Sequence, residues 1–135
     1  MSTDIHTQPK SSKAMIWAGR IISALPILGL LVSGVMKILQ PPDAVKGFAD
    51  LGWPLSVAIG LAVVEIGCTI IYAIPQTAVL GAILLTGYLG GAVATHVRIG
   101  DYADITAPII MGVLVWLGLF LRDSRLRALI PLRKV

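Results

Sequence analysis

The chain has 135 residues, of which 56% are hydrophobic and only 13% are charged. Soluble domains carry roughly 25% charged residues, so this composition, with its long apolar runs, indicates a single membrane domain. The net charge of +4 does not indicate nucleic-acid binding, because the basic residues flank apolar segments instead of lining one solvated face.

Polar residues come first in the chain, and residues 1–13 predict a disordered cytoplasmic tail. Residues 14–131 predict one all-α domain, an integral membrane four-helix bundle of up-down-up-down topology. The first apolar run crosses a hydrocarbon core of ~30 Å at a rise of about 1.5 Å per residue. The four expected spans lie at about 16–39, 55–74, 78–97 and 105–121.

Two connections shape the expected bundle. The first loop contains Asp43–Leu51, where apolar residues share one face, so we expect a short interfacial helix followed by Trp53 as an interface anchor. The second connection, at Pro75-Gln76, is very short. It therefore makes the second and third spans antiparallel neighbours.

Lys and Arg residues gather on the side of the bundle that holds both chain ends. Eight flank that side and three flank the other, so the positive-inside rule predicts cytoplasmic termini. Residues 122–135 predict a basic, amphipathic tail on the membrane surface. The eight are Lys10, Lys13, Arg20, Arg122, Arg125, Arg127, Arg133 and Lys134, and the three are Lys37, Lys46 and Arg98.

Small residues occur along every expected span, and Gly87 and Gly91 have GxxxG spacing in the third. Small residues let helix backbones approach closely in membranes. We expect this pair to pack within the bundle; a homodimer contact is the alternative.

Three stretches follow a known family pattern. Residues 81–98, GAILLTGYLGGAVATHVR, correspond to a third helix, and residues 116–127, WLGLFLRDSRLR, to the end of a fourth. Residues 33–37, SGVMK, fit the first helix of the same pattern. In these stretches the chain resembles the DoxX-like (DoxX/DoxD) family of small four-helix bacterial membrane proteins, over roughly residues 20 to 131.

The resemblance implies a multi-pass protein of the bacterial inner (plasma) membrane. Relatives of this kind are linked to quinone-coupled thiol or thiosulfate oxidation and to oxidative-stress complexes. The resemblance therefore implies quinone as a ligand and a redox complex as the source of protein partners. It carries over no catalytic residue set, so whether the chain is an enzyme stays open.

Ionisable residues inside a membrane are costly and are functional candidates by default. Glu65 lies about eleven residues into the second span, near the bilayer midplane. It could relay protons or bind the head of a quinol. The alternative is a buried carboxyl that bonds a neighbouring helix and locks the bundle.

The remaining candidates lie toward the outer ends of the first and third spans. Lys37, His96, Arg98 and Asp101 share that side of the membrane by topology, and with Glu65 they could form a polar vestibule. The simpler interpretation is that Lys37 and Arg98 extend to the membrane interface and that aspartates of the following loop balance their charges. Tyr88, in mid-span, could add a hydroxyl to the same pocket.

We expect His96 to be structural or to lie at the membrane interface, and contact with a ligand is the alternative. No metal site is expected, because the only other histidine is His6 in the tail. The chain contains no GxSxG, Walker A or HExxH motif. Three functions remain: a quinone-contacting subunit of a redox complex, a non-catalytic membrane scaffold, and a small-solute carrier that works as a dimer. The surroundings of the Glu65 carboxyl best distinguish a ligand-binding function from a structural one. A polar cavity that includes Lys37 and His96 favours a ligand site.

Overall fold

The computed structural model describes residues 12–133, so the tail predicted over residues 1–13 lies almost wholly outside the described part. The described residues form helices and no strand. In chain order the elements are α1 (Lys13–Leu39), α2 (Pro42–Asp50), η1 (Leu55–Val57), α3 (Ala58–Ala73), η2 (Pro75–Thr77), α4 (Ala78–Arg98), α5 (Thr106–Arg122) and α6 (Ser124–Leu129).

Local sequence sets the helix ends. The Ser12 side chain accepts a hydrogen bond from the Met15 amide and caps the start of α1. At the other end Gln40 adopts a left-handed conformation with φ of 53°, and Pro41 follows. The Asp123 side chain accepts from the Arg125 amide and caps α6, which turns the chain away from the axis of α5.

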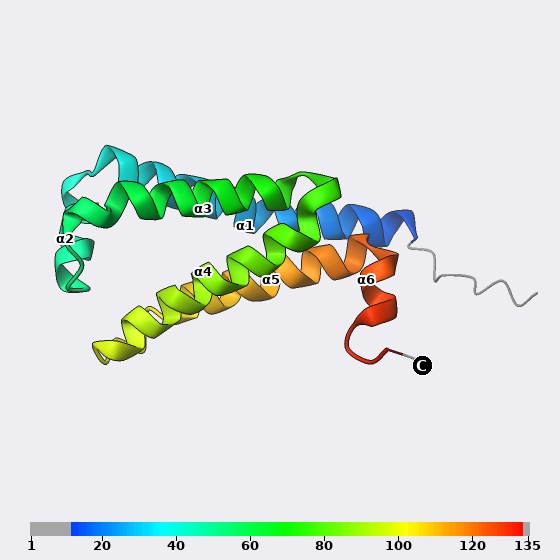
Figure 1. The fold of residues 1–135 in the computed structure, drawn as a ribbon. Coiled ribbons are helices and arrows are strands. Elements are labelled where there is room, and N and C mark those ends of the chain that lie inside the picture. Colours follow the sequence, from blue (N-terminus) through cyan, green and yellow to red (C-terminus); the bar gives the residue numbers. More distant parts are fainter. Residues whose placement is uncertain (1–11, 134–135) are drawn as a thin grey trace, which may run out of the picture.

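The long helices pack in two layers. α1 contacts α3 and α5, and α4 contacts the same two helices. In Figure 1, α1 and α3 form the upper layer and α4 and α5 the lower one. The layers meet near α6 and diverge toward α2. As expected, α3 and α4 are antiparallel neighbours across the short turn at Pro75.

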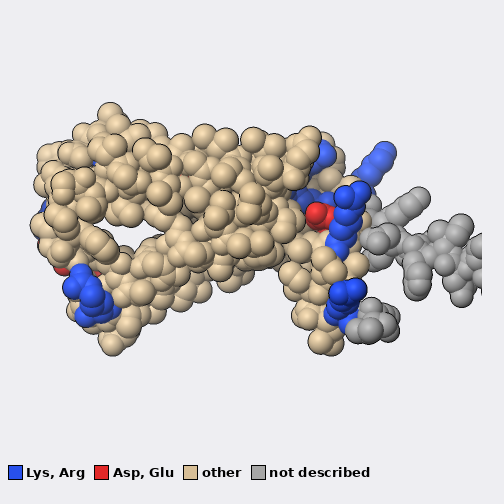
Figure 2. Space-filling model, in the orientation of Figure 1, with Lys and Arg blue, Asp and Glu red and all other residues tan. Residues whose placement is uncertain are grey.

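Three segments are long and apolar enough to cross a membrane by length and composition: Lys13–Leu39, Leu55–Ala73 and Pro75–Arg98. The helix Thr106–Arg122 is apolar but shorter. Figure 2 shows Lys and Arg at the two ends of the visible face, with a broad band free of them between. This distribution is typical of a chain whose middle contacts lipid.

The end of the molecule near α6 is tightly packed, and we call it the closed end. Tyr72 is fully buried there, and its hydroxyl donates to the Val115 carbonyl oxygen at 2.7 Å. The Tyr72 hydroxyl is also hydrogen-bonded to the Ser23 hydroxyl, with 3.0 Å between the two oxygens. The Arg122 guanidinium stacks over the Tyr72 ring, 5.3 Å from its centre. One tyrosine therefore ties α1, α3 and α5 together.

Glycines allow this close packing. A Cβ atom at Gly81 would collide with the backbone of Tyr72, and one at Gly118 would collide with the side chain and backbone of Ser23. Any larger residue would push α3 from α4, or α1 from α5. Small residues therefore bring the two layers together at the closed end, as expected for helices in membranes.

The prediction that Gly87 and Gly91 pack against another helix of the chain is wrong. A Cβ atom at either position would meet nothing within 4 Å. Both glycines instead face a cavity between the layers. The spacing is that of a packing motif, but the layers diverge at this level of α4 and leave no backbone to approach.

Candidate functional site

A cavity of about 560 Å³ lies between the layers toward the α2 end, which we call the open end. This volume is within the usual range for small-molecule sites, roughly 300–1,000 Å³. Figure 2 shows an opening through the surface in this region, between α3 above and α4 below. The wall is largely apolar, and its polar side chains are Ser33, Lys37, Glu65, Tyr88, Thr95 and His96.

A buried ion pair stands in this wall. The Lys37 Nζ atom is 2.6 Å from Glu65 Oε2 and 2.7 Å from Ser33 Oγ. The Glu65 side chain is only 2% exposed, whereas Lys37 is 18% exposed. Glu65 therefore points into the protein and not at lipid, and Lys37 turns inward to meet it instead of extending to the interface.

Helical spacing places each partner. Ser33 and Lys37 are four residues apart, so they share one face of α1. On α3 the buried residues recur every three or four positions, which puts Glu65 on the inward face. These buried residues are Ala58, Ala62, Glu65, Thr69 and Tyr72.

α4 supplies the opposite wall. Tyr88 lies close enough to Glu65 to interact with its carboxylate. Two turns further along, His96 lines the cavity, and its Nδ1 atom is 3.1 Å from Asp101 Oδ2 in the following loop. This hydrogen bond lowers the pKa of Asp101 below its ordinary value. His96 therefore connects the cavity to an ionised carboxylate near the surface.

Two of the predicted candidates lie outside the wall. Asp101 contacts His96 from the loop, and Arg98 donates through Nη2 to the Leu51 carbonyl oxygen. The Arg98 bond fixes the segment after α2 against the end of α4. That segment forms part of the cavity wall, since Leu51 and Trp53 line the cavity together with the buried Phe48.

Asp104 adds a second carboxylate beside this pair. One ligand atom from each of His96, Asp101 and Asp104 lies within 4.8 Å of the others, a spacing that could hold a metal ion. The sequence predicts no metal site here. Asp101 also accepts a hydrogen bond from the Asp104 amide and contacts the histidine ring.

The sequence did not reveal the polar role of Ser33. Its hydroxyl accepts a hydrogen bond from Lys37. A signal was available, because a serine four residues before an intramembrane lysine lies on the same helix face. Phe48 and Leu51 were also missed as wall residues, since no local pattern shows which way a connecting helix folds.

Together these features define a multi-pass helical membrane protein with an ion pair in the wall of an internal cavity. The chain belongs to the DoxX-like family, whose model matches residues 21–118. The matched segment includes Lys37, Glu65, Tyr88 and His96. The family predicted from the resemblance is thus confirmed. The chain matches no curated protein and no solved structure.

Proposed function

We propose that this chain is a membrane subunit of a redox complex and that its cavity binds the head of a membrane quinone. The observation that carries the proposal is the Lys37–Glu65 pair in the wall of a cavity large enough for a small ligand. Buried ion pairs contribute little to stability compared with apolar packing. A pair kept beside empty space therefore favours a role in binding.

The chemistry of the wall suits a quinone. A lysine ammonium has three donors, and Ser33 and Glu65 take two of them. The third is available for a quinone carbonyl oxygen. The Glu65 oxygen not bound to Lys37 can accept from a quinol hydroxyl. Conversion of quinone to quinol takes up two electrons and two protons; the partner protein supplies the electrons, and these side chains hold protons beside the ring.

We place the protein in the bacterial inner membrane with both termini in the cytoplasm. The excess of Lys and Arg on the side of the chain ends supports this orientation. In this arrangement all four long helices, α1, α3, α4 and α5, cross the bilayer, and α2 lies at the outer interface. The cavity then opens within the outer half of the membrane. A membrane quinone can reach it there by lateral diffusion in the bilayer.

Quinone binding to purified protein in detergent tests the proposal. A short-tailed benzoquinone should bind the unaltered chain, and the double variant Lys37→Met/Glu65→Gln should bind at least about tenfold more weakly, because it loses charge-assisted hydrogen bonds. The matched control is Lys46→Met/Asp50→Asn, which removes the exposed 2.6 Å ion pair of α2. Equal loss in both double variants, or none in either, would contradict the proposal.

A non-catalytic scaffold is the second candidate. The observation that favours it is that Lys37 is already bonded to both Glu65 and Ser33 without a ligand. In that case the Lys37→Met/Glu65→Gln variant should still capture the same partner proteins from solubilised membranes, and no quinone should co-purify with the unaltered chain. Co-purified quinone that the variant loses would exclude the purely structural role.

A further inference from the structure

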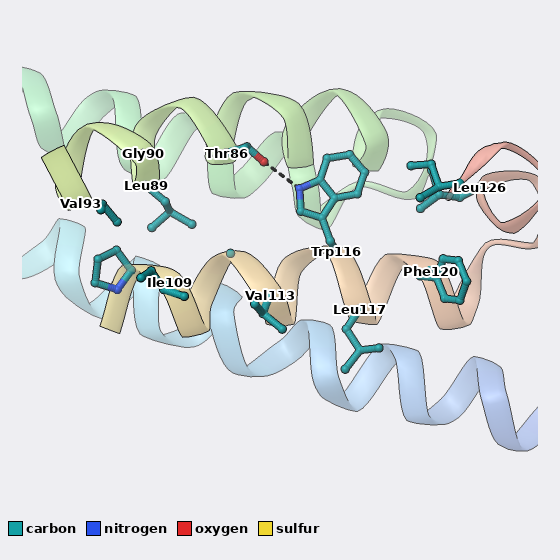
Figure 3. Close-up of a pocket in the computed structure, with 13 residues that line it drawn as sticks. Thr86, Leu89, Gly90, Val93, Ile109, Val113, Trp116, Leu117, Phe120 and Leu126 are labelled. Atoms are coloured by element: carbon teal, nitrogen blue, oxygen red, sulfur yellow. Dashed lines mark hydrogen bonds between the residues drawn. The ribbon is translucent and has the colours of Figure 1, made fainter. Parts of the chain in front are cut away.

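A second hollow, of about 700 Å³, runs between α4 and α5 and ends at α6. We call it the groove; in Figure 3, Leu89 of α4 and Trp116 of α5 project into the space between the two helices. Its wall is almost entirely hydrocarbon, formed mainly by Leu89, Val93, Ile109, Val113, Leu117 and Phe120.

The two polar side chains in the groove are already bonded. Trp116 donates through Nε1 to Thr86 Oγ1 at 2.7 Å, as Figure 3 shows, and the Thr86 hydroxyl donates to the Ala82 carbonyl oxygen at 2.7 Å. Neither has a donor left for a ligand. The groove therefore suits a hydrocarbon chain and offers nothing to a polar head.

The groove adjoins the cavity. Leu89 of α4 and Pro108 of α5 line both hollows, so the two spaces meet at these side chains. One hollow carries an ion pair and a histidine, and its neighbour is apolar. Such a pair of adjoining spaces matches an amphiphile with a compact polar head and a long apolar tail.

We infer that the groove holds the isoprenoid tail of the quinone whose head lies in the cavity, the tail passing between Leu89 and Pro108. The inference rests on the proposed function and adds the ligand class, a long-tailed prenyl quinone. The groove follows α5 from Pro108 to Phe120, which is about 18 Å, long enough for several isoprene units.

The groove adds only modestly to the free energy of quinone binding. Lipid tails are as apolar as the groove, so the quinone tail gains no hydrophobic transfer energy on entering it. Packing against a fitted wall is the remaining source of affinity. The groove should thus raise affinity for a long-tailed quinone by roughly tenfold and should orient the head in the cavity.

Filling the groove tests the inference. Gly90 lines it, and a Cβ atom there would meet nothing within 4 Å, so Gly90→Leu should occupy the groove without strain. The matched control is Gly67→Leu on α3, which also meets nothing within 4 Å and lies in the wall of neither hollow. Binding of a short-tailed and a long-tailed benzoquinone is measured for both variants and for the unaltered chain.

We expect the unaltered chain and Gly67→Leu to bind the long-tailed compound roughly tenfold more tightly, and Gly90→Leu to bind both compounds equally, with short-tail affinity unchanged. If short-tail binding is normal but the unaltered chain shows no tail preference, the inference fails and the head site stands. The inference also fails if Gly90→Leu keeps the preference and instead loses a co-purified phospholipid or changes the oligomeric mass. Failure of both quinones to bind the unaltered chain would overturn the proposed function as well.

Discussion

The two ends of the molecule use the same helices in opposite ways. At the closed end α1, α3 and α5 meet around Tyr72, whose hydroxyl bonds both Ser23 and the Val115 carbonyl. At the open end the layers separate, and the polar groups of Lys37 and Glu65 border a cavity. Buried polar groups therefore hold the helices together at the closed end, whereas at the open end they line a cavity.

Glycine shows the same contrast. Gly81 and Gly118 are needed at the closed end because any Cβ atom would strike the neighbouring helix. Gly87 and Gly91 touch nothing and leave the cavity wide. What decides the role of a glycine in this fold is therefore the separation of the layers at its level, and the spacing of glycines along one helix does not reveal it.

The largest expected effect comes from filling a position at the closed end. Gly81→Leu should destabilise the protein by more than about 3 kcal/mol, because α3 and α4 must move apart. Gly87→Leu, at the open end, should change stability by less than about 1 kcal/mol and should abolish quinone binding by filling the cavity. Thermal unfolding in detergent measures both, and equal destabilisation would contradict the contrast between the ends.

A smaller effect should follow from breaking the ion pair. Glu65→Gln leaves the Lys37 ammonium without its partner and should cost about 3 kcal/mol. Adding Lys37→Met should recover most of this loss, since no unpaired charge then remains. Unfolding of the two variants under the same conditions checks the prediction; a double variant no more stable than the single one would show that the charges are not coupled.

Removing one hydroxyl at the closed end should have a lesser effect. Tyr72→Phe deletes the bonds to Ser23 and Val115 in a fully buried place and should cost about 1 to 2 kcal/mol. Tyr88→Phe serves as the comparison, because its ring borders the cavity. If Tyr88→Phe proved the more destabilising of the two, the hydrogen bonds at the closed end would not be the main polar contribution to the stability of the fold.

The smallest effect concerns pH. His96 lowers the pKa of Asp101, so ionised Asp101 stabilises the folded state above the ordinary carboxyl value of about 3.9. This contribution disappears as pH falls through the lowered value. The difference in unfolding temperature between the unaltered chain and Asp101→Asn should therefore shrink as pH falls below about 4. His96→Gln should flatten that dependence; an unchanged profile in this variant would point to another partner.

Sequence alone predicts a good part of this structure and less of the site. The helices begin and end within three residues of the apolar runs, because hydropathy and prolines mark them locally. The position of Glu65 in the middle of its helix follows from counting residues along the apolar run. Its contact with Lys37 does not, since the two are 28 positions apart and meet only through the relative rotation of α1 and α3. Arg98 likewise bonds Leu51, 47 positions away, because the loop after α2 folds back.

Photo-cross-linking with an azido-benzoquinone tests the central claim most directly, namely that the open end is a quinone site. The account predicts that label is incorporated into the α4 peptide that carries Tyr88 and His96, and that excess unlabelled quinone prevents it. Label spread over exposed apolar residues of α1, such as Trp17 and Leu25, and unaffected by the competitor would contradict the claim.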